Sequence, residues 1–173
     1  MLDDTKFNFS SFKLPSSDKI NTQTFAEYLN IEQSHEIKRT HLFNGRYENI
    51  YIDKHAISTL TSILDFANSC AKKTLNLTKE LDIGFWFNDM PSGSITEPHT
   101  HDDDDELLSG VYYIKVPQQS GNLILNIQGN KNEITPHEGQ LILFRPDCIH
   151  EVTENKSDEK RLSIGMNFGI RQI

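Results

Sequence analysis

Two histidines one residue apart, followed at once by a run of acids, are the part of this sequence best suited to chemistry. The segment PHTHDDDDE places His99, His101 and Asp103 at two-residue spacing, and an isolated His150 follows later in FRPDCIHEV. Residues two apart on a strand project to the same side. His99 with His101, or His101 with Asp103, can therefore offer two ligands to one metal ion. Two histidines and a carboxylate, with open positions beside them, suit non-haem Fe(II) and oxygen chemistry.

The alternative interpretation of these histidines is a charged surface loop without a metal. Adjacent carboxylates repel one another, so most of the acids from Asp102 to Glu106 are expected to lie in a solvated loop. A second histidine segment far along the chain and the strand-like context favour the metal site over this reading.

Arg161 is the second feature with chemical meaning. It comes eleven residues after His150 in RLSIGMNF, where Arg161 and Ser163 alternate onto one face and Leu162 and Ile164 onto the other. An arginine buried in a barrel needs an anion, and a dicarboxylic acid supplies a bidentate one. An arginine at a strand edge, with its charge in water, is the alternative.

The elements that must position these residues change character near Leu81. Before it, the chain is expected to start with a lead-in strand or a loosely held arm that ends near Pro15. The spacing of apolar residues then predicts helices over 24–38 and 53–77, and Asp53 is expected to cap the second one. After it, the period becomes two. Strand-like runs at 83–88, 108–116, 121–127, 139–144, 149–152 and 161–168 are separated by turns rich in Gly, Pro, Asn and Ser.

This order of elements predicts a mostly β fold with N-terminal helices. The class is a double-stranded β-helix, a jelly-roll or cupin-like barrel buttressed by helices. We expect a single domain over 1–173, in which 1–80 is a helical support region and 81–173 is the jelly-roll catalytic core.

Charge and cysteine content narrow the partners and the compartment. A formal net charge of -8 argues against nucleic acid or an anionic membrane as the main partner, which leaves a small-molecule or peptide substrate. Two distant cysteines give no disulfide framework, and no apolar leader or membrane-spanning run occurs, so we predict a cytoplasmic protein. A homodimer is compatible with helices flanking a jelly roll.

Taken together, these motifs resemble a known enzyme family. The span 86–168 is similar to the 2-oxoglutarate and Fe(II)-dependent oxygenases, and within them to the small oxygenases of phages and marine bacteria, through WFN, PHTH, LSGVYYIKVP, SGNL, PHEGQLILFRPDCIHEV and RLSIGMNF. The resemblance implies a dioxygenase that uses Fe(II), 2-oxoglutarate and O2. Such an enzyme hydroxylates a small molecule or a protein side chain and releases succinate and CO2. The resemblance also makes His150 the distal histidine ligand, while Arg161 and Ser163 hold the far carboxylate of 2-oxoglutarate.

The proximal ligands of the family can be assigned in two ways. Counting forward from WFN places them at His99 and His101, whereas counting back from LSGVYY places them at His101 and Asp103. Most enzymes of the superfamily use histidine-x-aspartate, and a carboxylate neutralises part of the ferrous charge. We therefore predict His101, Asp103 and His150 as the metal ligands, with His99 as the alternative to Asp103.

Tyr112 is predicted as a further co-substrate contact. On LSGVYYIKV, Lys115 is expected to face solvent, which sends Tyr112 and Ile114 the other way. The Tyr112 hydroxyl can then hydrogen-bond the co-substrate, with a core tyrosine as the alternative. Trp86 is expected to lie in the core rather than in the site.

A metal-binding cupin that does not use 2-oxoglutarate is the main alternative function. PHTH with the acid five residues later matches the first cupin motif, and the ligands would be His99, His101, Glu106 and His150. Against it, FRPDCIH lacks the glycine expected after the proline, and a cupin gives no reason for an arginine and a serine on the last strand. A non-catalytic binding module is the second alternative.

Overall fold

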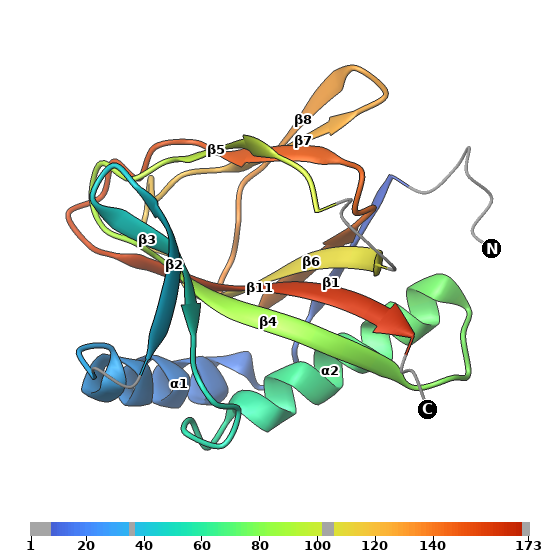
Figure 1. The fold of residues 1–173 in the computed structure, drawn as a ribbon, viewed down its shortest axis with the longest axis horizontal. Helices are drawn as coiled ribbons and strands as arrows, with labels where there is room; N and C mark the ends of the chain where they lie inside the picture. Colours follow the sequence, from blue (N-terminus) through green and yellow to red (C-terminus); the bar gives the residue numbers. More distant parts are fainter. Residues whose placement is uncertain (1–7, 35–36, 102–105, 171–173) are drawn as a thin grey trace.

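Two antiparallel sheets stack face to face, and two helices cover the outer face of the larger sheet (Figure 1). The computed structural model describes residues 8–34, 37–101 and 106–170. The elements in these ranges are β1 (Phe9–Lys13), α1 (Ser17–Ile31), β2 (Lys38–Phe43), β3 (Arg46–Tyr51), α2 (Leu60–Leu75), β4 (Leu81–Met90), β5 (Thr96–His99), β6 (Glu106–Lys115), β7 (Leu123–Ile127), β8 (Asn130–Ile134), β9 (Gln140–Phe144), β10 (Ile149–Val152) and β11 (Arg161–Ile170).

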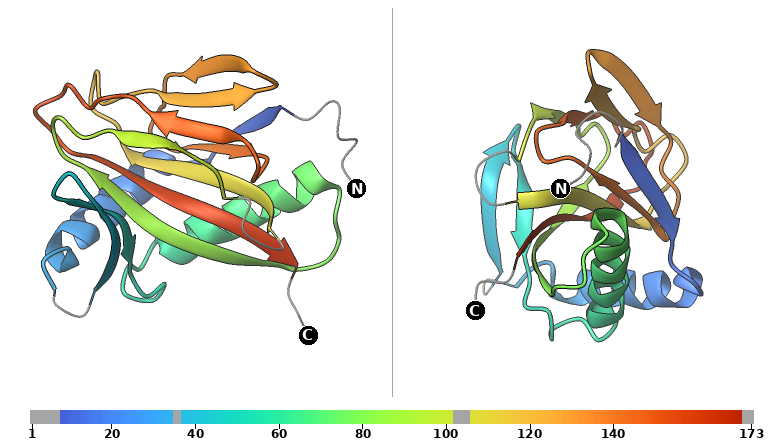
Figure 2. Two further views of the ribbon diagram at one scale, coloured as in Figure 1. Left: turned by 45° about the horizontal axis from the view of Figure 1, so that its top comes forward. Right: turned by 90° about the vertical axis from the view of Figure 1, so that its right-hand side faces the viewer.

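The larger sheet has the strand order β1-β9-β6-β11-β4-β3-β2, and the smaller has the order β5-β10-β7-β8. Figure 2 shows the smaller sheet on the side of the larger one that faces away from α1 and α2. From β4 to β11, successive strands alternate between the two sheets, except that β7 and β8 both lie in the smaller one, and this alternation is typical of a jelly roll. The predicted fold class, a mostly β double-stranded β-helix supported by helices, is confirmed.

The larger sheet is buried on both faces, and each face has its own core. Apolar side chains of α2 and of one face of the sheet form the larger core, which includes Leu60, Ile63, Ile164 and Phe168. A second core between the sheets contains Tyr113, Leu125, Ile142 and Phe144. Strands covered on both faces lose the simple alternation of apolar and polar residues, as the burial of β6 shows.

The six strands predicted after residue 81 are β4, β6, β7, β9, β10 and β11, and β5 and β8 add two short strands that were not predicted. The region 1–80 is more than a helical support. β1 pairs with β9 at one edge of the larger sheet, and the β2–β3 hairpin pairs with β4 at the other.

The first helix differs most from its prediction, because α1 runs over 17–31 instead of 24–38. Three of its four buried residues are polar, and the fourth is Tyr28. Ser17, Asn21 and Thr24 are buried, and Asn21 donates to the carbonyls of Tyr113 and Ile114. A search for apolar periodicity misses such a face. The second helix begins at Leu60 with Thr59 as its N-cap, so the predicted cap at Asp53 is wrong. In the part of the chain that the structure describes, no helix has the length and apolar character needed to cross a bilayer.

Candidate metal centre

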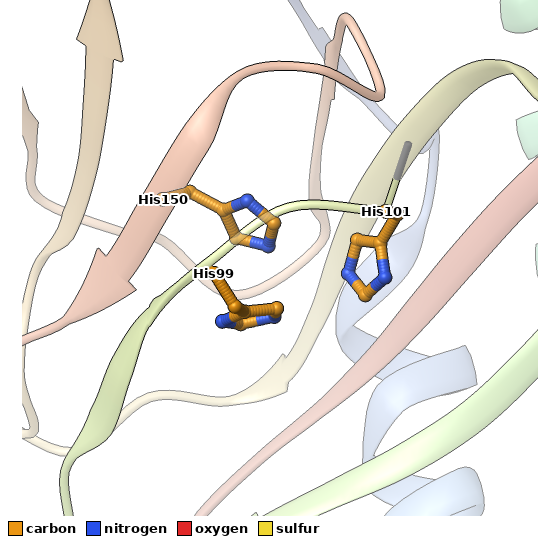
Figure 3. Close-up of side chains that lie close together, drawn as sticks. All are labelled: His99, His101 and His150. Atoms are coloured by element: carbon orange, nitrogen blue, oxygen red, sulfur yellow. The ribbon is translucent and has the colours of Figure 1, made fainter. Parts of the chain in front are cut away.

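Three histidines from two segments, the end of β5 and β10, converge between the two sheets. His99 at the end of β5 lies directly opposite His150 on β10 in the strand pairing, and their rings are 4.2 Å apart. His101 follows β5, its backbone N–H donates to the carbonyl of Pro146, and its ring lies 5.0 Å from each of the other two. Potential ligand atoms of all three lie within 4.8 Å of one another, and Figure 3 shows the rings gathered around one point.

Two of these imidazoles are oriented by carbonyl groups. The Nδ1 atoms of His99 and His150 lie 2.8 Å and 3.0 Å from the carbonyl oxygens of Glu97 and Cys148. Because a carbonyl only accepts, each Nδ1 carries the proton and each Nε2 presents a lone pair, the arrangement typical of histidine metal ligands. Burial, with the neighbouring His99 and His101 adding to it, lowers the pKa of His150 to about 3, so its imidazole is neutral at pH 7.

The pocket beside the histidines extends inward to Arg161. This arginine is 1% exposed, and its Nη1 donates to the carbonyls of Gly121 at 2.9 Å and Ser120 at 3.4 Å. Its buried Nε has no hydrogen-bond partner within the described ranges. A buried donor without an acceptor is costly, and a guanidinium remains charged in proteins. This end of the pocket is therefore suited to an anion.

Most residues predicted for the site meet in this one pocket. His99, His101, His150, Arg161 and Ser163 all line it. Asp103, the predicted third ligand, lies outside the described residues, so its role stays a prediction. His99, its alternative, belongs to the cluster.

Glu106, the fourth ligand of the cupin alternative, does not join the histidine cluster among the residues that the structure describes. One of its carboxylate oxygens instead accepts a hydrogen bond from the side-chain amide of Asn167. The four-ligand cupin set is therefore not assembled here.

Tyr112 does not face this pocket, and that prediction is wrong about the face. Its hydroxyl donates to Asn21 Oδ1 of α1 at 2.7 Å, on the helix side of the larger sheet. Tyr113 faces the pocket instead, with the Arg161 guanidinium 5.1 Å from its ring centre and its buried hydroxyl without a partner among the described residues. The prediction placed Tyr112 on the face of β6 opposite Lys115. Because both faces of the sheet are covered at β6, the direction of Lys115 could not show which of the two faces holds the site.

Trp86 also departs from its expected place in the core. The indole lines the pocket, and its ring centre lies 5.3 Å from that of His101. It also lines an outer groove, which shares His99 and His101 with the pocket. The indole lies over Gly165, its partner on β11, where a Cβ atom would meet the ring at 2.5–2.7 Å. A glycine at this position lets the indole lie flat on the strand.

Substituting Gly165 with alanine is expected to displace the indole of Trp86 and lower the free energy of unfolding by about 1–3 kcal/mol, because the added methyl overlaps the ring. Trp86 is the single tryptophan of the chain, so its fluorescence emission reports the displacement directly. Gly84→Ala on β4, the strand that carries Trp86, is the matched control, since a Cβ atom there meets nothing within 4 Å. Identical emission spectra for Gly165→Ala and the unsubstituted protein would contradict the assignment.

Comparison with known proteins agrees with this site. The model of the 2OG-Fe(II) oxygenase superfamily matches residues 85–169, which include all three histidines and Arg161. Among curated protein sequences no significant match was found.

Solved structures extend the likeness to nearly the whole chain. A Pseudomonas putida prolyl-4-hydroxylase is 20% identical, with a TM-score of 0.65 over 95% of this chain and 89% of that one. A Trichoplax adhaerens prolyl hydroxylase, solved with a hypoxia inducible factor peptide fragment, is 18% identical, with a TM-score of 0.67 over 94% and 84%. The α-ketoglutarate dependent carbocyclase SnoK from nogalamycin biosynthesis is 10% identical, with a TM-score of 0.76 over 94% and 79%.

These structures share the fold, and the matched segment contains the residues gathered in the pocket. The narrower likeness to enzymes of phages and marine bacteria stays a prediction. Residues 85–169 of this chain, which contain the pocket, match the 2OG-Fe(II) oxygenase superfamily.

Proposed function

We propose that this protein hydroxylates a small molecule or a protein side chain in a reaction that depends on Fe(II) and O2 and converts 2-oxoglutarate to succinate and CO2. One observation carries the proposal. A single pocket holds three converging histidines at the end shared with the outer groove, and a buried arginine with an unpartnered donor at its closed end.

The residues present fit both groups that the family implies. Imidazole nitrogens are good ligands for Fe(II), and His99, His101 and His150 offer three of them within reach of one ion. The unpartnered Arg161 Nε and Tyr113 hydroxyl match the oxygens of a carboxylate. The proposed metal ligands are His101 and His150 with either His99 or Asp103.

The side chains of the pocket bind and orient, while the oxidising chemistry comes from the iron. When bound, Fe(II) supplies the activation of O2 that these side chains cannot provide. Arg161, Ser163 and Tyr113 are proposed to fix one carboxylate of 2-oxoglutarate, so that its other end lies toward the histidines. Burial raises the pKa of Tyr113, so its hydroxyl keeps the proton that it donates.

The primary substrate is proposed to enter by the outer groove. The groove shares Trp86 and both proximal histidines with the pocket, and β3 of the hairpin adds Asn49 and Tyr51. The proteins with similar structures act in different settings. One was solved with a hypoxia inducible factor peptide fragment, and another belongs to nogalamycin biosynthesis. The substrate, a cytoplasmic location and a homodimer all stay predictions.

Purified protein tests the function directly. Reconstituted with Fe(II) under argon, it should develop a visible absorption band when 2-oxoglutarate is added, and on exposure to O2 it should form succinate. A cupin would bind the metal without this response to 2-oxoglutarate, and a metal-free module would do neither. Absence of both the band and succinate would reject the proposal.

The two adjacent tyrosines of β6 give a matched pair of variants. Tyr113→Phe is expected to weaken 2-oxoglutarate binding about 10- to 100-fold, the effect of losing one hydrogen bond to a charged group. Tyr112→Phe should leave that affinity unchanged and instead lower the free energy of unfolding by about 1 kcal/mol, because it loses the bond to Asn21. Calorimetric titration with 2-oxoglutarate and urea unfolding measure the two effects. The reverse pattern would restore Tyr112 as the co-substrate contact.

A further inference from the structure

Arg46, on the β2–β3 hairpin, forms a dense set of contacts at the edge of the pocket. Its side chain is 10% exposed. One terminal nitrogen, Nη1, donates to Asn88 Oδ1 at 3.1 Å and to the carbonyl of Asp89 at 3.4 Å. The other, Nη2, donates to Glu48 Oε1 at 2.8 Å, to the carbonyl of Ile95 at 2.7 Å and to Thr96 Oγ1 at 3.3 Å.

The hydrogen bond from Arg46 determines which way the side-chain amide of Asn88 points. A guanidinium has only donors, so the atom of Asn88 that Arg46 contacts must be the oxygen. The amide nitrogen, with two hydrogens to donate, is then directed away from Arg46. Within the described part of the chain this nitrogen has no hydrogen-bond partner, and Asn88 lines both the pocket and the outer groove.

The strand register places this amide beside the co-substrate residues. Asn88 on β4 pairs with Ser163 on β11, two residues from Arg161 on the same face. Resting on the function proposed above, we propose that Asn88 donates a hydrogen bond to a carboxylate oxygen of 2-oxoglutarate, and that Arg46 is the positioning residue that fixes the amide in this orientation.

Arg46 also anchors the strand that carries His99, a candidate metal ligand. Its bonds to Ile95 and Thr96 hold the start of β5, which ends at His99. Arg46 lies outside residues 85–169, the segment matched by the superfamily model. The β2–β3 hairpin therefore supports the pocket through Arg46, which contacts both β4 and the start of β5.

Asn88→Asp is the most informative variant, because it keeps the acceptor that Arg46 contacts and converts the donor into a second, negatively charged acceptor. We expect it to weaken 2-oxoglutarate binding at least about 10-fold, with iron content and melting temperature unchanged. The dissociation constant is measured anaerobically on the Fe(II) protein by titrating the visible band. Asn130→Asp places the same charge at an exposed position of β8 outside both the pocket and the outer groove, and should leave the affinity near that of the unsubstituted protein.

A double-mutant cycle separates positioning from a structural role of Arg46. Arg46→Met should weaken 2-oxoglutarate binding about 3- to 10-fold, and Arg46→Lys, which can still donate to Asn88, should restore part of it. In an Asn88→Ala background, Arg46→Met should cause no further loss of affinity. A purely structural arginine would cause the same loss in both backgrounds, and that result would overturn the positioning role.

The outcomes distinguish this inference from the proposed function. If the unsubstituted protein does not bind 2-oxoglutarate, both fail. If it binds 2-oxoglutarate and Asn88→Asp binds it equally well, the donor role of Asn88 is wrong while the proposed function stands.

Discussion

Replacing His150 with alanine is expected to remove iron from the protein and abolish succinate formation. His150 is 7% exposed, its Nδ1 is fixed by the carbonyl of Cys148, and its ring is close to both other histidines. Loss of a ligand so oriented should reduce Fe(II) affinity by more than about 100-fold, since changes to the supporting groups alone cost 10- to 100-fold. Iron bound after reconstitution and desalting, measured by a ferrozine assay, gives the result.

The control for this variant is His137→Ala, which removes an exposed histidine outside the cluster and should keep full iron content. Circular dichroism of both variants shows whether the sheets are intact. Full iron retention by a folded His150→Ala protein would contradict the assignment of His150 as a metal ligand.

The same assay identifies the third ligand. If His99 binds the metal, His99→Ala should lose iron and Asp103→Ala should keep it; if Asp103 binds, the two results exchange. The position of His99 opposite His150 on the paired strand favours the first outcome. A site with three imidazoles would carry one negative charge fewer than the histidine-x-aspartate arrangement, which would strengthen its attraction for anionic 2-oxoglutarate.

Arg161→Met is expected to weaken 2-oxoglutarate binding about 30- to 5000-fold while leaving iron content nearly unchanged. Removing one partner of a buried, hydrogen-bonded charge pair costs about 2–5 kcal/mol, which corresponds to this range. The hydrogen bonds of the Arg161 side chain go to the carbonyls of Ser120 and Gly121 rather than to the histidines, so its loss should leave the metal ligands in place. Titration of the anaerobic Fe(II) protein with 2-oxoglutarate measures the affinity, and the ferrozine assay measures the iron.

Two further variants keep this test interpretable. Arg161→Lys retains the charge with a single donor group, so it should fall between the unsubstituted protein and Arg161→Met. Arg145→Ala removes a more exposed arginine paired with Asp147 and should not alter 2-oxoglutarate affinity. Unchanged affinity in a folded Arg161→Met protein would contradict the assigned anion site.

The sequence predicted the strands of the barrel and most of the pocket because both depend on local spacing. Two-residue periodicity located β4, β6, β7, β9, β10 and β11, and the same periodicity put Arg161 and Ser163 on one face. The β2–β3 hairpin was not predicted. Its strands alternate charged and apolar residues weakly, and their place at the sheet edge depends on pairing with β4, far along the chain.

Errors at individual positions have a common physical origin. Tyr112 and Tyr113 are both fully buried and are adjacent residues of the same type, so the sequence alone could not show which one faces the pocket. Asn88 and Arg46 are far apart in sequence, and only the folded hairpin brings the guanidinium to the amide. The mostly polar buried face of α1 depends likewise on carbonyl groups of β6 that no local pattern reveals.

Strand β11 divides its residues between two separate tasks. Leu162, Ile164, Met166 and Phe168 pack toward the helices, while Arg161, Ser163 and Gly165 line the pocket. Substitutions at the second set can change selectivity while the first set continues to hold the molecule folded. Substitutions at Ser163 should therefore recover more folded protein than substitutions at the four apolar positions, whereas Gly165 tolerates no side chain without displacing the indole of Trp86.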